Sequence, residues 1–132
     1  FGNYDLKVFK NKLDDAEHYA LTSKNFSYRK SPRVRVISTN IINTIFNFKN
    51  NIFKSTLNYL SKFNNFALII VKSPSHTKNS KENSKILRYY GVGAQIIKEL
   101  KIKDMILVSR SKKRIIALKG YGIKIKKQEI LK

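Results

Sequence analysis

Residues 87–125 read LRYYGVGAQIIKELKIKDMILVSRSKKRIIALKGYGIKI, and this stretch decides the fold because its pattern alternates between helix and strand. Apolar residues at helical spacing predict a helix over 86–100, and the apolar run Met105 to Val108 predicts a buried strand. A short helix is predicted over 112–118, with Gly120 as a candidate C-cap, before a last strand that begins over 121–126. The stretch therefore predicts a βαβ-like unit at the C-terminal end of the chain.

The residues before this unit predict more strands and one long helix. Alternating or continuous apolar patterns predict four strands, over 4–10, 17–22, 33–38 and 66–71. The first two would form a hairpin around a turn at 11–15. Apolar residues spaced by three and four predict a helix over 41–63 with Asn40 as candidate N-cap, and polar composition predicts loops over 23–32 and 73–84. We expect a mixed α/β fold, a sheet with flanking helices, in a single domain over 1–132.

The composition limits the environment and the partners of the chain. Its 132 residues carry a formal net charge of +20 and contain no Cys, which excludes disulfides and thiolate metal sites. A basic balance of this size usually indicates nucleic acid, a membrane surface or a phosphorylated ligand. The lysines are spread along the chain, however, and accompany abundant Asn, Ile, Phe and Tyr, as AT-rich codon usage would produce. We expect no membrane or nucleic-acid partner, and a polyanion-binding surface remains the alternative.

Several motifs in the deciding stretch occur together in one known family. They are Arg88, Tyr90-Gly91-Val92-Gly93-Ala94-Gln95-Ile96, Ser109, Arg114 and Gly120-Tyr121-Gly122. In this order, and without a gap, they resemble the C-terminal part of GTP cyclohydrolase II. Two N-terminal segments are similar to the family as well: Glu17-His18-Tyr19-Ala20-Leu21 resembles its E-H-x-A-L hairpin, and Pro32-Arg33-Val34-Arg35-Val36 resembles its P-x-x-V-R strand.

The resemblance implies a reaction whose apparatus is missing here. The family opens the guanine ring of GTP and releases formate and pyrophosphate, using magnesium and a zinc ion that three cysteines hold to activate water. The first cysteine position corresponds to Asn40, and the family's phosphate-contacting loop is replaced by Lys72-Ser73-Pro74-Ser75. The family's Asp before x-Arg corresponds to Ile86. We therefore expect no metal and no cofactor in this chain.

Some family positions are retained. Arg88 matches the family's proposed nucleophile toward the α-phosphate, and we expect it to be inactive without its partners. Ser109 and Arg114 match nucleotide-phosphate contacts, and Lys112 and Lys113 would add positive charge at a helix start. The glycines at 91, 93, 120 and 122 are interpreted as structural, at the entry and the end of helices. His18 and His76 lack companions at metal-ligand spacing, so no metal role is assigned to them.

The pattern resembles a zinc-less form of the domain that some bacteria fuse to 3,4-dihydroxy-2-butanone 4-phosphate synthase. Because the chain begins at Phe1, we expect it to be the C-terminal part of a longer, cytoplasmic bacterial protein. Its expected role is to support, dimerise or regulate the fused synthase in riboflavin biosynthesis, as a homodimer. Two alternatives remain: a divergent GTP cyclohydrolase II with another metal arrangement, or a module that binds GTP, phosphate or a polyanion through Arg88, Ser109, Arg110, Lys112, Lys113 and Arg114.

Overall fold

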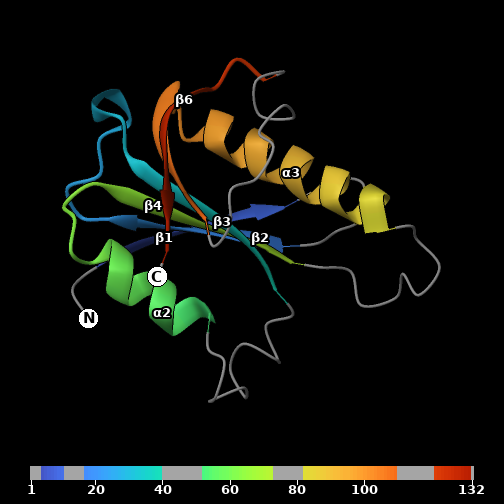
Figure 1. Ribbon diagram of the computed structural model, residues 1–132, viewed down its shortest axis with the longest axis horizontal. Coiled ribbons are helices and arrows are strands. Elements are labelled where there is room, and N and C mark those ends of the chain that lie inside the picture. The colour runs from blue at the N-terminus through green and yellow to red at the C-terminus, as the bar shows by residue number, and fades with distance from the viewer. Residues whose placement is uncertain (1–3, 11–16, 40–51, 73–81, 110–120, 132) are drawn as a thin grey trace.

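In the described part of the chain, a six-stranded mixed sheet carries one helix on each face (Figure 1). The computed structural model describes residues 4–10, 17–39, 52–72, 82–109 and 121–131. The sheet order is β1-β2-β4-β3-β5-β6. The strands are β1 (Tyr4–Lys10), β2 (Glu17–Ser23), β3 (Arg33–Thr39), β4 (Phe66–Lys72), β5 (Asp104–Ser109) and β6 (Lys124–Ile130), and the helices are η1 (Tyr28–Lys30, a 3-10 turn), α2 (Ile52–Leu60) and α3 (Glu82–Glu99). The expected mixed α/β class is confirmed.

The N-terminal hairpin is confirmed. β1 pairs antiparallel with β2 from Tyr4 opposite Ser23 to Lys10 opposite Glu17, and β2 continues antiparallel against β4. β1 is the terminal strand of the described sheet, and it exposes two apolar side chains on one face, Leu6 at 60% and Val8 at 53% of their surface. The turn expected at 11–15 lies outside the described residues.

The other half of the sheet is parallel. β3 pairs with β4 on one side and with β5 on the other, and β6 extends the sheet beyond β5 with a register shift between Met105 and Ile106. Parallel strands need a crossover between them, and β3 is followed by α2 while β4 is followed by α3. This arrangement brings the carboxyl ends of β3, β4, β5 and β6 to one edge of the sheet and their amino ends to the other.

Side-chain alternation along the strands divides the core into two layers. On one face, Val34, Ala67, Ile69 and Leu107 pack against Ala94 and Ile97 of α3. On the other, Leu68, Phe66 and Val108 pack against Leu57 and Leu60 of α2. Figure 1 shows the two helices on opposite sides of the strands. Both faces of the parallel strands are therefore buried, as their nearly continuous apolar sequences predict.

Several predicted boundaries differ from the structure. α3 begins at Glu82 and not at 86, so the predicted loop over 73–84 was wrong at its end, and Gly91 and Gly93 lie inside the helix and not at its entry. β6 begins at Lys124 and not at 121, because residues 121 and 122 form a turn in which Gly122 has a φ of +76°. α2 ends at Leu60, where Phe63 N–H donates to the Leu60 carbonyl, so the predicted helix end at 63 was three residues too late. Residues 40–51, 73–81 and 110–120, with their predicted elements, lie outside the described residues.

Candidate functional site

The carboxyl edge of the parallel strands is the place where this type of sheet usually binds ligands. β3 ends there at Thr39, β4 at Lys72, β5 at Ser109 and β6 at Ile130. Asn40, which resembles the family's first cysteine position, follows β3 directly but lies outside the described residues. These strands therefore end on the side of the sheet where the resemblance locates the chemistry.

Helix α3 lies unusually close to the sheet at this site. A Cβ atom added to Gly93 would lie 2.9 Å from Cγ1 of Val36 on β3, a distance that a real side chain does not adopt. The helix ends beside the amino end of β5, so its earlier residues lie toward the carboxyl edge. Arg88 precedes Gly93 by five residues, or about 7.5 Å along the helix axis. The backbone thus carries Arg88 toward the carboxyl edge, whereas its side chain lies outside the described part.

Ser109 lies on the same face of the sheet as α3. Leu107 pairs with Val34 and packs in the α3 core layer, and Ser109, two residues further along β5, lies on the same face by alternation. The Ser109 side chain is buried, and its hydroxyl accepts a hydrogen bond of 3.4 Å from Nε2 of Gln128 on β6. A phosphate at Ser109 would have to compete with this contact. The structure places Ser109 and the backbone of Arg88 on one face, and Arg110, Lys112, Lys113 and Arg114 lie outside the described residues.

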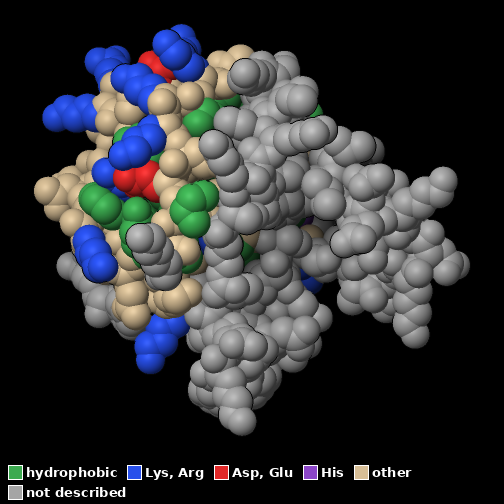
Figure 2. Space-filling view, viewed as in Figure 1, with side chains coloured by type: hydrophobic (Ala, Val, Ile, Leu, Met, Phe, Trp, Pro, Cys, Tyr) green, Lys and Arg blue, Asp and Glu red, His purple; other side chains and the backbone are tan. Residues whose placement is uncertain are grey.

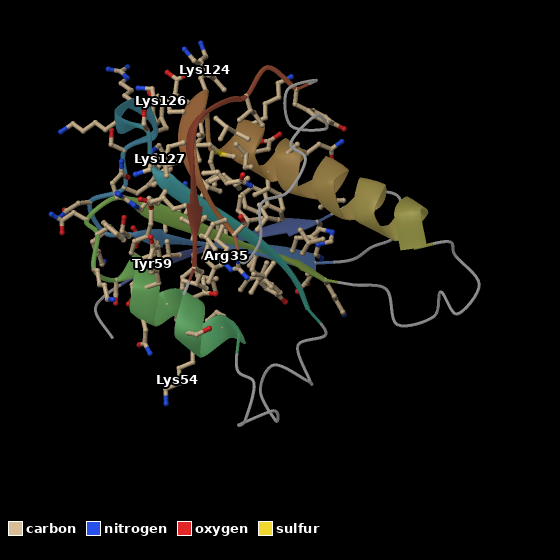
Figure 3. The ribbon with its side chains drawn as sticks, in the orientation of Figure 1. Arg35, Lys54, Tyr59, Lys124, Lys126 and Lys127 are labelled. Carbon is tan, nitrogen blue, oxygen red and sulfur yellow. The ribbon has the colours of Figure 1, made fainter. Side chains whose placement is uncertain are left out.

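A buried arginine lies on the opposite face of the same strand. Arg35 exposes 7% of its surface, and its Nε donates to Oγ1 of Thr56 on α2 at 3.1 Å (Figure 3). A guanidinium is always charged, so its burial requires hydrogen-bond acceptors around it. Sequence reasoning treated Arg35 only as part of a strand. Its burial could have been predicted from its position in the strand, because alternation places Arg35 on the same side as the buried Ile37.

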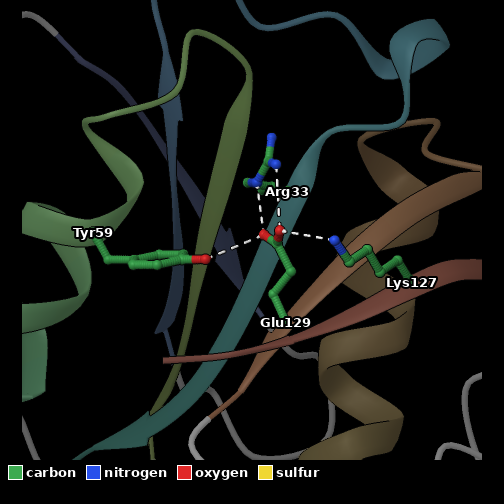
Figure 4. A network of polar contacts seen from close by, with 4 residues as sticks. All are labelled: Arg33, Tyr59, Lys127 and Glu129. Atoms are coloured by element: carbon green, nitrogen blue, oxygen red, sulfur yellow. Dashed lines mark hydrogen bonds and ion pairs between the residues drawn. The ribbon is translucent and has the colours of Figure 1, made fainter. Parts of the chain in front are cut away.

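A second polar network crosses the same face (Figure 4). Glu129 on β6 accepts two hydrogen bonds from Arg33 on β3, Nε to Oε1 at 2.7 Å and Nη2 to Oε2 at 3.4 Å, and a third from the Tyr59 hydroxyl at 3.2 Å. Lys127 approaches the same carboxylate at 3.8 Å. The Arg33 hydrogen bonds are the main cause that lowers the pKa of Glu129, whereas burial and then the Glu129 charge raise the pKa of Tyr59. Because these groups connect β3, β6 and α2, the network fixes the fold.

The family's zinc does not fit the donor set of this chain. There is no cysteine in the sequence, and the described residues contain no group of three or more His, Asp or Glu side chains placed to hold a metal ion. His18 is buried, and its Nδ1 accepts a hydrogen bond of 3.1 Å from the backbone N–H of Lys72. His76 lies outside the described residues. In the part of the chain that the structure covers, no helix is long and apolar enough to cross a membrane.

Comparisons with known proteins agree with the architecture. Two curated relatives, each named riboflavin biosynthesis protein RibBA, come from Chlorobium phaeovibrioides and Bacillus subtilis, and each is 44% identical over 39 residues. These residues are 30% of this chain and about a tenth of each relative. The crystal structure of RibBX from A. baumannii, a two-domain 3,4-dihydroxy-2-butanone 4-phosphate synthase, superimposes with a TM-score of 0.59 at 19% identity. It matches 98% of this chain, which covers 40% of that protein.

The family model described as GTP cyclohydrolase II matches residues 56–129, from the buried Thr56 on α2 to Glu129 at the end of β6. The match covers more than half of the chain and includes the second half of α2, all of β4, α3 and β5, and most of β6. This chain therefore belongs to the GTP cyclohydrolase II family of riboflavin biosynthesis.

Proposed function

We propose that this chain is a non-catalytic GTP cyclohydrolase II-like domain of a riboflavin-biosynthesis protein, and that it supports a fused 3,4-dihydroxy-2-butanone 4-phosphate synthase. One observation carries the proposal. The family model still matches residues 56–129, and α3 packs closely on β3 at Gly93, while the sequence offers no thiolate where the family needs three.

The family's reaction depends on water that a zinc ion activates. Zinc in a catalytic site lowers the pKa of its bound water and supplies the nucleophile at neutral pH. Without thiolates at the carboxyl edge, no such centre can form from the family's ligands. The His18 imidazole is no substitute, because Nδ1 is engaged with the backbone of Lys72 and the side chain is buried. Arg88 and Ser109 alone can contact a phosphate, but they cannot deliver a hydroxide to the guanine ring.

A supporting role accounts for what the chain retains. A domain without its reaction still needs two packed layers and a rigid sheet in order to present a surface to its neighbour. The fold is shared with RibBX, a two-domain 3,4-dihydroxy-2-butanone 4-phosphate synthase, and this supports a synthase as the fused neighbour. The homodimer expected from the sequence belongs to the same proposal.

The first experiment measures formate release from GTP by the chain with Mg²⁺ and Zn²⁺ supplied. The expected result is no formate above the rate without protein. Clear turnover that is lost in an Arg88→Ala variant would overturn the proposal and support the divergent cyclohydrolase. Turnover that persists in that variant would indicate a contaminating enzyme, and the assay would be repeated after further purification until one of the two results holds.

The second experiment measures synthase activity in the full-length protein. Gly93→Ala, which separates α3 from β3, should lower the synthase activity or its thermal half-life, while Gly91→Ala on the same helix should not. If Gly93→Ala loosens the domain but both variants keep the same synthase activity and thermal half-life, the domain does not support the synthase. The nucleotide-binding alternative predicts instead that GTP raises the melting temperature and that Arg114→Ala abolishes the rise at matched ionic strength.

A further inference from the structure

A cavity of about 730 Å³ opens at the amino edge of the parallel strands, at the opposite end of the sheet from Ser109. Three segments that are distant in sequence meet there: η1, the turn between α3 and β5, and the turn that leads into β6. Backbone hydrogen bonds hold them together, from Ile106 N–H to the Pro32 carbonyl at 3.0 Å and from Lys124 N–H to the Lys103 carbonyl at 2.7 Å. The cavity is thus part of the rigid sheet and is separate from the carboxyl edge.

The lining of this cavity is strongly basic. Among its described lining residues, four carry positive charge and one, Asp104, carries negative charge; the cations are Arg29, Lys98, Lys101 and Lys103. In the described part of the chain the ion pairs are Lys24–Asp5, Arg33–Glu129 and Lys127–Glu129, so none of these four cations is neutralised by a described carboxylate within ion-pair distance. Figure 2 shows Lys and Arg side chains gathered at this end of the molecule, and Figure 3 places Lys124 and Lys126 there as well.

Aromatic and apolar groups complete the cavity. Tyr28 and Tyr121 line it, and the Arg29 guanidinium lies 5.5 Å from the centre of the Tyr28 ring. Ile102 and Ile123 are buried beneath them in the α3 core layer. Tyr121 exposes 39% of its surface, so its ring is available to a ligand. This lining suits a ligand with phosphate groups and a flat ring system. The cations can bind the phosphates, and the exposed ring and the apolar side chains beneath it can contact the flat ring.

The backbone at Lys101 is a second, independent observation. The last turn of α3 closes with Ile102 N–H on the Ile97 carbonyl at 3.2 Å and Lys101 N–H on the Lys98 carbonyl at 2.9 Å. This helix ending normally places Gly at the left-handed residue, which here is Lys101 with a φ of +65°. A lysine adopts that conformation at an energetic cost that Gly avoids. Lys101 lines the cavity in this strained conformation, and strained residues often cluster at binding sites.

We infer that this cavity binds a phosphorylated small molecule with an aromatic ring, of the nucleotide class, with its phosphates at Lys101, Lys103 and Arg29 and its ring against Tyr121. This site is independent of the proposed supporting role and of the carboxyl edge. We expect Lys98 to contribute less to ligand binding, because a cation in the last helical turn also interacts with the negative end of the helix dipole.

Calorimetric titration of the full chain with inorganic tripolyphosphate and with ATP, at constant ionic strength, tests this inference. Lys101→Asn/Lys103→Gln removes two charges, and Asn tolerates the left-handed conformation. The matched control, Lys7→Gln/Lys10→Gln, removes two charges from β1 at the far edge of the sheet. We expect the first variant to weaken ATP binding about tenfold or more and the control to change it less than about twofold. Circular dichroism verifies that both variants are folded.

The ring contact has its own test. ATP should bind the unmodified chain more tightly than tripolyphosphate does, and Tyr121→Leu should remove this difference while the affinity for tripolyphosphate stays the same. The inference is overturned if ATP does not bind at millimolar concentration, or if both double variants weaken binding equally, which would indicate non-specific attraction to the net charge. It is also overturned if Arg88→Gln or Arg114→Gln abolishes binding while Lys101→Asn/Lys103→Gln does not, since the ligand would then occupy the carboxyl edge.

Discussion

Arg33 and Glu129 form a two-point ion pair across β5, although 96 residues separate them in the chain. The guanidinium of Arg33 also stacks on Phe63, with 3.6 Å between its central carbon and the ring centre. The Glu129 side chain exposes only 14% of its surface. One carboxylate therefore joins the first residue of β3 to the end of β6 and, through the Tyr59 hydroxyl, to α2.

Replacing Glu129 by Gln should destabilise the fold. The change weakens two hydrogen bonds from a guanidinium that is itself largely buried, so we expect a loss of about 1–3 kcal/mol in the free energy of unfolding at pH 7. Urea titration measures it. Lys127→Gln is the matched control, because the Lys127 side chain is 68% exposed and its ammonium lies 3.8 Å from the same carboxylate; its cost should stay below about 0.5 kcal/mol. Equal costs for the two variants would contradict this assignment.

The same carboxylate should make stability depend on acid pH. Its pKa in the folded chain is lowered from the ordinary value of 4.5, so its contribution is complete above that value and disappears as the pH falls through the folded-state pKa. The difference in unfolding free energy between the unmodified chain and Glu129→Gln should thus be constant at neutral pH and shrink in acid. A difference that stays constant down to pH 2 would show that the charge is not the cause.

Two glycines of α3 should respond in opposite ways to alanine. Gly93→Ala would place a methyl group 2.9 Å from Val36, and we expect a loss of about 1–3 kcal/mol as helix and strand move apart. Among the described residues, the Tyr121 hydroxyl at 3.5 Å is the one neighbour that a methyl group at Gly91 would meet, so Gly91→Ala should be neutral or stabilise by up to about 1 kcal/mol through helix propensity. Thermal unfolding of both variants measures these changes in stability. A destabilised Gly91→Ala variant would show that the helix is placed differently.

The buried Arg35 and Thr56 should be energetically coupled. Thr56→Val removes the acceptor of the Arg35 Nε–H without changing the shape of the side chain, and should cost about 1–3 kcal/mol. In an Arg35→Met background the same change should cost clearly less, because no buried charge then needs the hydroxyl. A double-mutant cycle by urea unfolding measures the coupling. Additive costs would mean that other groups satisfy the guanidinium.

Sequence patterns predicted the central strands well because these strands bury alternate or continuous side chains against the helices, as β2 and the run Phe66 to Val71 do. β1 is mostly exposed, but its alternating sequence still predicted it. The N-terminus of α3 was missed because residues 82–84, Glu-Asn-Ser, have loop composition, and the helix includes them without an apolar signal. The start of β6 was missed because periodicity does not reveal that Gly122 adopts a left-handed conformation.

The candidate site was less predictable than the fold. Motif matching identified Arg88 and Ser109, and the backbone brings them to one face, but it gave no indication that Arg35 is buried, since arginine usually lies at the surface. The basic cavity was missed for a different reason. Its cations come from residues 29, 98, 101 and 103, and only the pairing of β5 with β6 and the packing of η1 bring these segments together.

The exposed apolar side chains of β1 make the solubility of the chain depend on salt. Leu6 and Val8 project from the terminal strand of the described sheet, a location that favours edge-to-edge association between copies. A net charge of +20 opposes that association, but its repulsion extends only about 10 Å at 0.1 M salt and about 3 Å at 1 M. Ionic strength should therefore control solubility. In dilute salt, charge repulsion keeps the molecules apart, whereas in concentrated salt the repulsion is screened and β1 can associate with β1 of another copy.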